Sequence, residues 1–295
     1  IFHTINRSKQ NSNQLKMTDA AQVAVLTDPF ALVSQPKLWD GKRNSSSGIR
    51  LRTTGELSCT QDGPTYLCLV PGHSTCLAWQ TNPATDYWSL PFRGHLATAV
   101  DRSNVKLARI VSVALRLTMI NNSDQNEGYW ESARISVQPS DFTVDPVTGG
   151  LRYKAIQPTD PMLPGTGLGG ANPVPNVVLS NYQTYQSGKL RDLEQVQFKL
   201  NSVNTEHEFT PIYDPITADM FLDQTMDMIL IKLHGRVQNT GPTQLMYDAV
   251  SNQEVVYVED TSLARLMTNN MKVPHYEFIL ENANARLPAE KISDL

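Results

Sequence analysis

Residues 105–138 contain two strand-like runs separated by a polar turn, and this stretch constrains the fold more than any other. In the first run, Val111, Val113, Leu115, Leu117 and Met119 occupy every second position. A period of two with β-branched residues is typical of a strand that buries one face. The Asn, Asp and Gly residues between positions 121 and 128 provide turn chemistry. The pattern therefore predicts a β-hairpin formed by the two runs.

The second run of this hairpin, residues 129–138, has two faces that differ in chemistry. One face carries Trp130, Ser132 and Arg134, and the other carries Glu131, Ala133, Ile135 and Val137. The large apolar area of Trp130 predicts an anchor in the core or in an interface. Glu131 and Arg134 are expected to be hydrogen-bonded framework charges. Together with Gly128 and Tyr129, these three residues form the predicted structural site of the hairpin.

The rest of the chain contains many short strand-like runs between turns rich in Pro, Gly and Asn. Further strands are predicted at residues 21–27, 48–57, 66–70, 75–80, 151–156, 176–185, 195–200, 226–237 and 253–259. Helical periodicity is limited to residues 216–224 and 261–269. Such a pattern predicts an all-β, antiparallel sandwich or barrel. Long and unequal connections favour a Greek-key or jelly-roll arrangement over a simple meander, with a Pro/Gly-rich insertion and extended termini.

A chain of 295 residues can bury a sizeable core. The predicted organisation is an N-terminal arm at 1–20, a main β domain in two parts at 21–140 and 191–265, an inserted projection or loop region at 141–190, and a C-terminal tail at 266–295. A hydrophobic fraction of 40% and a charged fraction of 18% indicate a globular chain. No uncharged apolar stretch approaches the ~18 residues needed to cross a bilayer, so no membrane partner is expected.

No pattern in the sequence predicts a catalytic residue, a cofactor or a metal. Gly165, Gly167 and Gly170 fit a phosphate-binding glycine pattern, but neighbouring prolines exclude the helix that this chemistry requires. Cys59, Cys68 and Cys76 match no zinc spacing, and buried free thiols are the favoured interpretation. A solvated acidic face is favoured for the carboxylates between residues 201 and 231, with an intersubunit cation site as the alternative: Glu206, Glu208, Asp214, Asp219, Asp223 and Asp227.

The first sixteen residues contain Arg7, Lys9 and Lys16 and no acid. One interpretation is the end of a basic arm that contacts phosphates. The other is an ordinary polar terminus. A net charge of -4 excludes a uniformly basic nucleic-acid binder, although a local basic arm is compatible with it.

The stretch RIVSVALRLTMINNSDQNEGYWESARI, residues 109–135, resembles a segment of the capsid proteins of bacilladnaviruses, single-stranded DNA viruses of diatoms. Tyr129 stands where that family pattern has Trp. The resemblance implies a jelly-roll shell domain that assembles with copies of itself into an icosahedral virion capsid around single-stranded DNA. Through the related nodavirus shell, the resemblance also implies a candidate cleavage site at Asn282-Ala283. Because the chain is net acidic, a strongly basic segment is expected before Ile1.

Three alternatives differ in function from a capsid of a DNA virus. A coat protein of a small RNA virus would have the same shell. A carbohydrate-binding β-sandwich would predict paired cysteines and a secretion signal, and the sequence contains neither pattern. A hydrolase would require a nucleophile motif, and His73, Ser74 and His95 belong to none. The sequence thus favours a structural protein over an enzyme.

Overall fold

The computed structural model describes a sandwich core with its flanking segments. The described residues are 24–33, 35–42, 45–59, 65–69, 77–80, 103–120, 128–138, 141–144, 151–153, 178–201, 209–211, 226–235, 243–269, 272 and 289–292. The predicted basic residues of the arm, the glycine pattern and the Asn282-Ala283 dipeptide lie outside them. In the described part of the chain, no helix has the length and apolar character needed to cross a bilayer.

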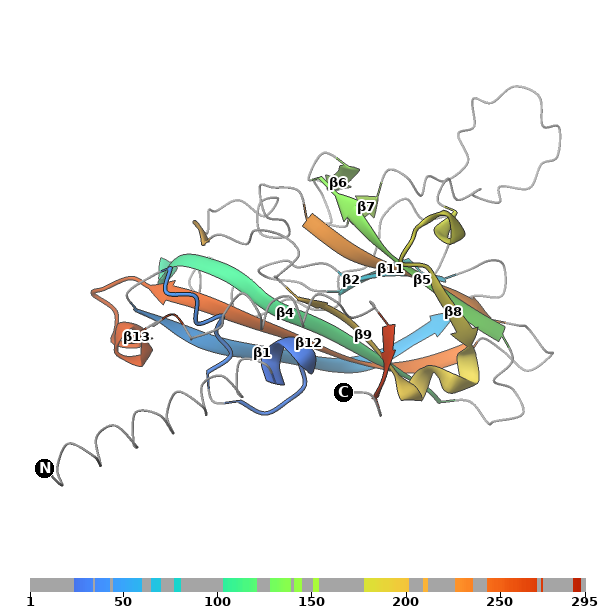
Figure 1. Ribbon diagram of the computed structural model, residues 1–295, viewed down its shortest axis with the longest axis horizontal. Helices are drawn as coiled ribbons and strands as arrows, with labels where there is room; N and C mark the ends of the chain where they lie inside the picture. Colours follow the sequence, from blue (N-terminus) through green and yellow to red (C-terminus); the bar gives the residue numbers. More distant parts are fainter. Residues whose placement is uncertain are drawn as a thin grey trace, which may run out of the picture.

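Two antiparallel sheets lie one above the other (Figure 1). The larger sheet has the order β13 (Thr268–Asn269), β1 (Ser45–Cys59), β12 (Thr243–Tyr257), β4 (Val105–Met119), β9 (Val196–Asn201) and β14 (Ala289–Lys291), with β10 (Thr210–Pro211) also paired to β4. The smaller sheet has the order β3 (Leu77–Gln80), β2 (Thr65–Leu69), β11 (Met226–Gly235), β5 (Gly128–Val137) and β8 (Gln186–Lys189). A separate pair is formed by β6 (Phe142–Val144) and β7 (Leu151–Tyr153).

Among the described residues, short 3-10 helices connect or flank the strands: η3 (Leu179–Asn181), η4 (Leu190–Gln195) and η6 (Ser262–Leu266). The last lies within residues 261–269, where helical turns are predicted. Residues 24–27 form one helical turn and not the predicted strand. Residues 178–185 contain η3 and turns in place of another predicted strand. In both segments, alternation of apolar residues was too short to distinguish a strand from a turn packed on a sheet.

The strand order is that of a jelly roll. Counting β1, β2, β4, β5, β8, β9, β11 and β12 as strands one to eight, the first, eighth, third and sixth are neighbours in the larger sheet. The second, seventh, fourth and fifth are neighbours in the smaller sheet. Successive strands therefore change sheets at every step except from β5 to β8. This arrangement of two interleaved Greek keys confirms the predicted fold class.

The prediction that residues 105–119 and 128–137 pair as a hairpin is wrong. Both strands exist, but β4 pairs with β12 and β9, whereas β5 pairs with β11 and β8. The link between them, residues 120–127, is eight residues long, enough to bridge sheets about 10 Å apart. Turn residues are equally compatible with a hairpin and with a corner between two sheets, so local sequence could not distinguish them.

A β-bulge at Val111 also changes the predicted faces of β4. The partner of Asn252 is Ser112, but the partner of Gln253 is Ile110, so Val111 is an extra residue in its strand. Val113, Leu115 and Leu117 point into the core between the sheets. Val111 instead packs with the N-terminal segment on the outer face of the larger sheet. The extra residue shifts the alternation by one, and this is why Arg109 also lies on the outer face.

The core lies between the two sheets. Trp130 of β5 is 5% exposed and meets Phe198 of β9 edge to face, with 5.4 Å between the ring centroids. A side chain at Gly188 of β8 would collide with the Trp130 indole, so glycine makes room for this ring. In β11, alternate residues enter the same core, as predicted: Ile229, Ile231 and Leu233.

Candidate functional site: the N-terminal strap and the polar face of the larger sheet

The N-terminal segment lies across the outer face of the larger sheet. We call residues 24–33 and 35–42 the N-terminal strap. Val25, Leu26 and Leu38 of the strap bury their side chains against Val111 of β4. In Figure 1 the strap is the dark blue segment below β1 and β12. One half of this sheet face is therefore covered, whereas Arg52, Thr54 and Glu56 farther along β1 are exposed.

Polar side chains of the sheet hold the strap mainly by its backbone carbonyls. Ser112 donates to the carbonyl oxygen of Val25 at 3.1 Å, and Lys199 Nζ donates to that of Thr27 at 2.6 Å. Asn252 Nδ2 donates to the Pro29 carbonyl oxygen at 2.9 Å. These three contacts involve β4, β9 and β12, so the strap bridges the middle of the sheet.

Arg50 of β1 extends this pattern. Its guanidinium donates to the carbonyl oxygens of Pro29 and Ala31. Its Nε also donates to Asn252 Oδ1 at 2.9 Å, which fixes the amide that holds Pro29. Recognition of carbonyl oxygens depends on the path of the backbone rather than on side chains, so these contacts specify the conformation of the strap.

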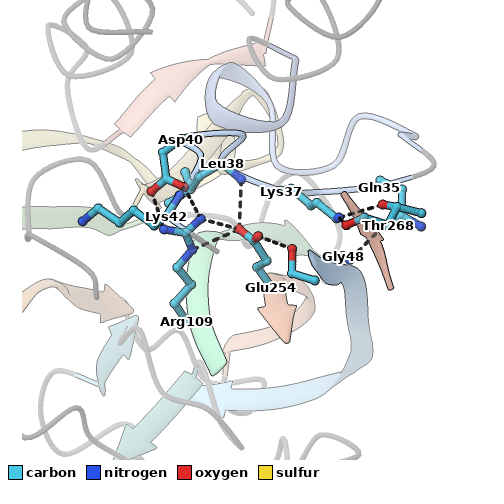
Figure 2. Close-up of polar contacts among 10 residues, drawn as sticks. Gln35, Lys37, Leu38, Asp40, Lys42, Gly48, Arg109, Glu254 and Thr268 are labelled. Carbon is cyan, nitrogen blue, oxygen red and sulfur yellow. Dashed lines mark hydrogen bonds and ion pairs between the residues drawn. The ribbon is translucent and has the colours of Figure 1, made fainter. Parts of the chain in front are cut away.

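The far end of the strap enters a buried ion network, shown in Figure 2. The two terminal nitrogens of Arg109 donate to the two carboxylate oxygens of Asp40, at 2.5 and 2.8 Å. Arg109 also donates to Glu254 Oε2 through Nε at 3.0 Å and through Nη2 at 2.7 Å. The side chains of Arg109 and Glu254 are fully buried, and that of Asp40 is 3% exposed.

Glu254 joins three chain segments. Its Oε2 atom accepts the backbone N–H of Leu38 at 3.2 Å, and its Oε1 atom accepts the hydroxyl of Ser46 at 2.5 Å. Arg109 in addition lies 4.2 Å from the centre of the Phe209 ring. The charged atoms of the network are thus hydrogen-bonded and enclosed, which is the condition under which buried ions are tolerated.

The electrostatics of the network favour the charged forms of its members. Burial alone would lower the pKa of Arg109, but the bonds and charges of Asp40 and Glu254 outweigh it and raise that pKa. Burial would likewise raise the pKa of Asp40, and Arg109 outweighs it and lowers that pKa. Both shifts make the ion pair permanent at ordinary pH.

Lys37 is the fourth charge of this region, and its environment is different. Its Nζ donates to the Thr268 hydroxyl at 2.7 Å and to the Thr268 carbonyl oxygen at 3.0 Å, and it faces no carboxylate at ion-pair distance among the described residues. Burial is the largest influence and lowers the pKa of Lys37 from its usual 10.5 to about 8. Lys37 therefore ties the strap to β13 at a cost in desolvation.

The residues of the predicted hairpin site all belong to β5 of the smaller sheet, and their side chains have different surroundings. Gly128 begins β5 with φ +134°, and a side chain there would collide with the His234 carbonyl oxygen. Trp130 lies in the core, as described above. Arg134 forms an ion pair with Asp227 of β11 at 2.8 Å. Glu131 and Tyr129 lie on the outer face of this sheet.

Tyr129 and Glu131 belong to a second polar cluster, which we call the Glu131 cluster. Glu131 Oε2 lies 2.7 Å from His234 Nε2, and its Oε1 accepts the Tyr185 hydroxyl at 3.0 Å. Lys232 lies 3.6 Å from the same carboxylate. The Tyr129 ring stacks on His234 at 4.0 Å and is 49% exposed. Unlike the Arg109 network, this cluster is open to water.

Other predicted candidates are only partly described. Asp227 is the one acidic residue of the predicted acidic face with a described side chain, and its partner is Arg134. Cys68 is a buried free thiol whose burial raises its pKa. Among the described residues, no cluster of three His, Cys, Asp or Glu side chains could hold a metal ion.

Sequence reasoning missed the Arg109 network. One usable signal was present: Arg109 and Glu254 are charged residues inside strongly apolar runs that read as buried strands. A charge in such a position requires a partner, because an isolated buried ion is very costly. The identity of Asp40 as that partner depends on the path of the strap, which no local pattern reveals.

Comparisons with known proteins give a consistent result. The model of the family described as "Shotokuvirus capsid protein" matches residues 17–221 and 215–290. A capsid protein of Avon-Heathcote Estuary associated kieseladnavirus is 27% identical, over 90% of this chain and 86% of that protein. A capsid protein of Chaetoceros protobacilladnavirus 2 is also 27% identical, over 90% of this chain and 83% of that protein.

Among solved structures, that of the infectious bursal disease virus Gt strain is similar at a TM-score of 0.48. Its sequence is 9% identical, and the match covers 92% of this chain and 97% of that chain. A score below 0.5 is too low to support a conclusion about the fold or the function of this chain.

Proposed function

This chain belongs to the Shotokuvirus capsid protein family, and from that premise we propose that copies of it assemble into an icosahedral shell around a single-stranded DNA genome. It is a capsid protein and a component of the virion. The resemblance inferred from residues 109–135 is thereby confirmed. The family match over most of the chain is the single observation that carries the proposal.

The fold suits a shell subunit for a physical reason. Two sheets share one packed core, so the subunit is rigid, and its loops and sheet edges are left to contact neighbours. Closed shells repeat the same modest interfaces by symmetry, and a rigid unit keeps those contacts in register. The shell domain at 21–140 and 191–265 and the projection at 141–190 remain part of this proposal. The sandwich itself also includes β8, at residues 186–189.

The strap indicates which face of the subunit receives the arm. Residues 24–31 lie on the outer face of the larger sheet, so the chain before residue 24 joins the sandwich at that face. We propose that this face lines the interior of the shell and that Arg7, Lys9 and Lys16 contact the genome there. Phosphate neutralisation by a basic arm would be electrostatic and independent of sequence.

The cations on the outer face of the larger sheet are bonded within the subunit, which supports a role for the arm in binding phosphates. The described cations on this face already have partners: Arg52 pairs with Asp248 at 2.5 Å, and Arg116 lies 3.4 Å from Asp28. Lys199 and Arg50 donate to strap carbonyls. Phosphates therefore compete with existing bonds on the sheet, whereas basic residues outside the sandwich would be available to them.

Membership of a capsid family indicates a structural role. We propose that the chain has no enzymatic activity, and cleavage at Asn282-Ala283 is the one reaction that requires a test. Mass spectrometry of assembled particles tests this point directly. An intact chain through residue 283 in mature particles would exclude the cleavage.

Electron microscopy of the purified protein, combined with nuclease protection, tests the proposed function. We expect closed particles of uniform diameter that protect single-stranded DNA, with yield falling as salt concentration rises because phosphate contacts release counterions. Protected RNA would favour the coat protein of an RNA virus. A protein that stayed monomeric in all assembly conditions, with no protected nucleic acid, would overturn the proposal.

A further inference from the structure

The C-terminal strand β14 is attached to the sandwich by a small and specific set of contacts. Ala289, Glu290 and Lys291 pair with Phe198, Gln197 and Val196 at the free edge of β9. In Figure 1, β14 is the red arrow beside β9 near the C-terminus. The preceding strand in the chain, β13, lies at the opposite edge of the same sheet.

Gln186 of β8 holds the other side of this strand. Its side-chain nitrogen donates to the Ala289 carbonyl oxygen at 3.0 Å, and its side-chain oxygen accepts the Ala289 N–H at 2.8 Å. In an antiparallel ladder, the N–H and C=O of one residue point to the same side. Both groups of Ala289 therefore point away from β9, and the amide of Gln186 replaces a further strand.

These contacts hold β14 as an extended peptide between β9 and Gln186. The edge of β9 supplies one backbone ladder, and Gln186 supplies a bidentate amide on the opposite side. The Ala289 side chain is 7% exposed and belongs to the main core with Phe198 and Trp130, so the position selects a small residue. Recognition by backbone hydrogen bonds and one small side chain is the mode of strand addition at sheet edges.

The linker before β14 is long enough for this site to receive β14 from its own chain or from a neighbouring copy. Residues 270–288 separate β13 from β14, and nineteen residues reach up to about 60 Å when extended. Crossing the larger sheet takes five strand spacings, or roughly 24 Å. A tethered segment has an effective concentration of about millimolar for short linkers. In the proposed shell, the same segment of a neighbouring copy would compete for this site.

We propose that the edge of β9 and Gln186 form an acceptor site for the C-terminal strand, and that neighbouring copies exchange β14 through this site in the assembled shell. The proposal rests on the shell assembly proposed above. The free subunit binds its own β14, as the structure shows. Exchange in the shell replaces that contact by the same contact from a second copy, with no change in the hydrogen bonds made.

A mixed cysteine experiment distinguishes exchange from self-binding. Lys291 and Val196 lie opposite each other. The backbone N–H and C=O groups of Lys291, like those of Ala289, point away from β9. Opposed residues of that kind have Cα atoms about 4.5 Å apart, within the range of a disulfide. One full-length chain carries Val196→Cys and a second carries Lys291→Cys. The two are mixed unfolded, assembled together and oxidised.

We expect a reducible cross-linked dimer in purified particles from the mixture. Particles made from either single variant alone control for Cys59, Cys68 and Cys76 and should lack this dimer. A chain that carries both substitutions reports binding of its own strand. Adding Gln186→Ala to both chains should lower the dimer yield by up to about thirtyfold, because two hydrogen bonds of about 1 kcal/mol each are lost.

The outcomes separate the two proposals. Particles that form normally but contain only the internal cross-link of the double variant would overturn strand exchange and leave the capsid function intact. Failure of the unmodified chain to form particles would overturn the proposed function, and exchange with it. A dimer whose yield does not respond to Gln186→Ala would show that the acceptor site is misassigned.

Discussion

Two clusters of charged side chains lie on opposite outer faces of the sandwich, and they differ mainly in their access to water. The Arg109 network on the larger sheet is enclosed by the strap, with fully buried Arg109 and Glu254. The Glu131 cluster on the smaller sheet contains His234 and Lys232, with side chains 21% and 17% exposed. Ion pairs of similar length therefore contribute differently to stability in the two clusters.

The difference teaches what each cluster does for the fold. A partly hydrated ion pair contributes about 0–1 kcal/mol, because water competes with the partner. A buried pair is weak evidence for net stability, yet its loss is severe, because the remaining charge stays buried and unpaired. The Arg109 network consequently specifies where the strap lies on the larger sheet, whereas the Glu131 cluster contributes little to the stability of the fold.

Arg109→Met gives the largest expected effect and tests this comparison most directly. The change leaves two buried carboxylates, Asp40 and Glu254, without their cation, so we expect a loss of about 5 kcal/mol in the free energy of unfolding. Urea denaturation of the unassembled chain measures it. The matched control adds Asp40→Ala and Glu254→Leu, which removes all three charges. A control as unstable as the single variant would show that burial of unpaired charge is not the cause.

Trp130→Ala tests the apolar layer between the two clusters. Removing a buried indole that packs on Phe198 should cost about 3–5 kcal/mol through lost burial and a residual cavity. Thermal unfolding and particle yield are the measurements. Trp130→Phe, which keeps an aromatic ring, should cost much less. Normal stability and particles from Trp130→Ala would contradict the assignment of Trp130 as an anchor.

Much of the sandwich could be predicted from sequence, because a strand with one buried face has an apolar residue at every second position. The strands β1, β4, β5 and β11 were located by this period, whereas β2 and β9 were located as short strand-like runs. The alternation in β11 also gave the correct core face. The period says nothing about which strand is the neighbour. For this reason the partner of β4 was predicted wrongly, although β4 itself was found.

Features that depend on contacts distant in sequence were not predictable. The bulge at Val111 is defined by the register with β12, more than one hundred residues away. Asp40 meets Arg109 only because the strap crosses the sheet, and Gln186 meets Ala289 only because two strands from different sheets end side by side. These sites arise from tertiary arrangement, and local residue patterns carry little information about it.

Lys37 sharpens the comparison, because it is a buried charge with no carboxylate at ion-pair distance among the described residues. Burial lowers its pKa in the folded state to about 8, whereas the unfolded value is near 10.5. Between these values the unfolded chain binds more protons, so the contribution of Lys37 to the free energy of unfolding rises with pH across this window. Below about pH 8 both states are protonated and the contribution is constant.

The expected measurement is a difference between two proteins. Urea denaturation of the unmodified chain and of Lys37→Met at pH 7 and pH 10 cancels the titration of groups common to both. We expect the unmodified chain to gain about 2 kcal/mol relative to the variant at the higher pH. A difference that is independent of pH would show that Lys37 is hydrated in the folded state.

His234→Phe gives the smallest expected effect and examines the hydrated side of the comparison. Burial, the largest influence, lowers the pKa of His234, Lys232 lowers it further, and the Glu131 carboxylate opposes both. Because the folded pKa lies below the unfolded value, the unfolded chain binds more protons as the pH falls through 6.5. Stability contributed by neutral His234 is therefore present above that pH and is lost below it.

Phenylalanine retains the stacking on Tyr129 and removes the titrating nitrogen. We expect His234→Phe to change the free energy of unfolding at pH 7.5 by less than about 1 kcal/mol, and to reduce its decline between pH 7 and pH 5. The pair is partly hydrated, so added salt should reduce the difference further. A loss as large as that of Arg109→Met would mean that both clusters are equally dry, and the contrast between the two faces would disappear.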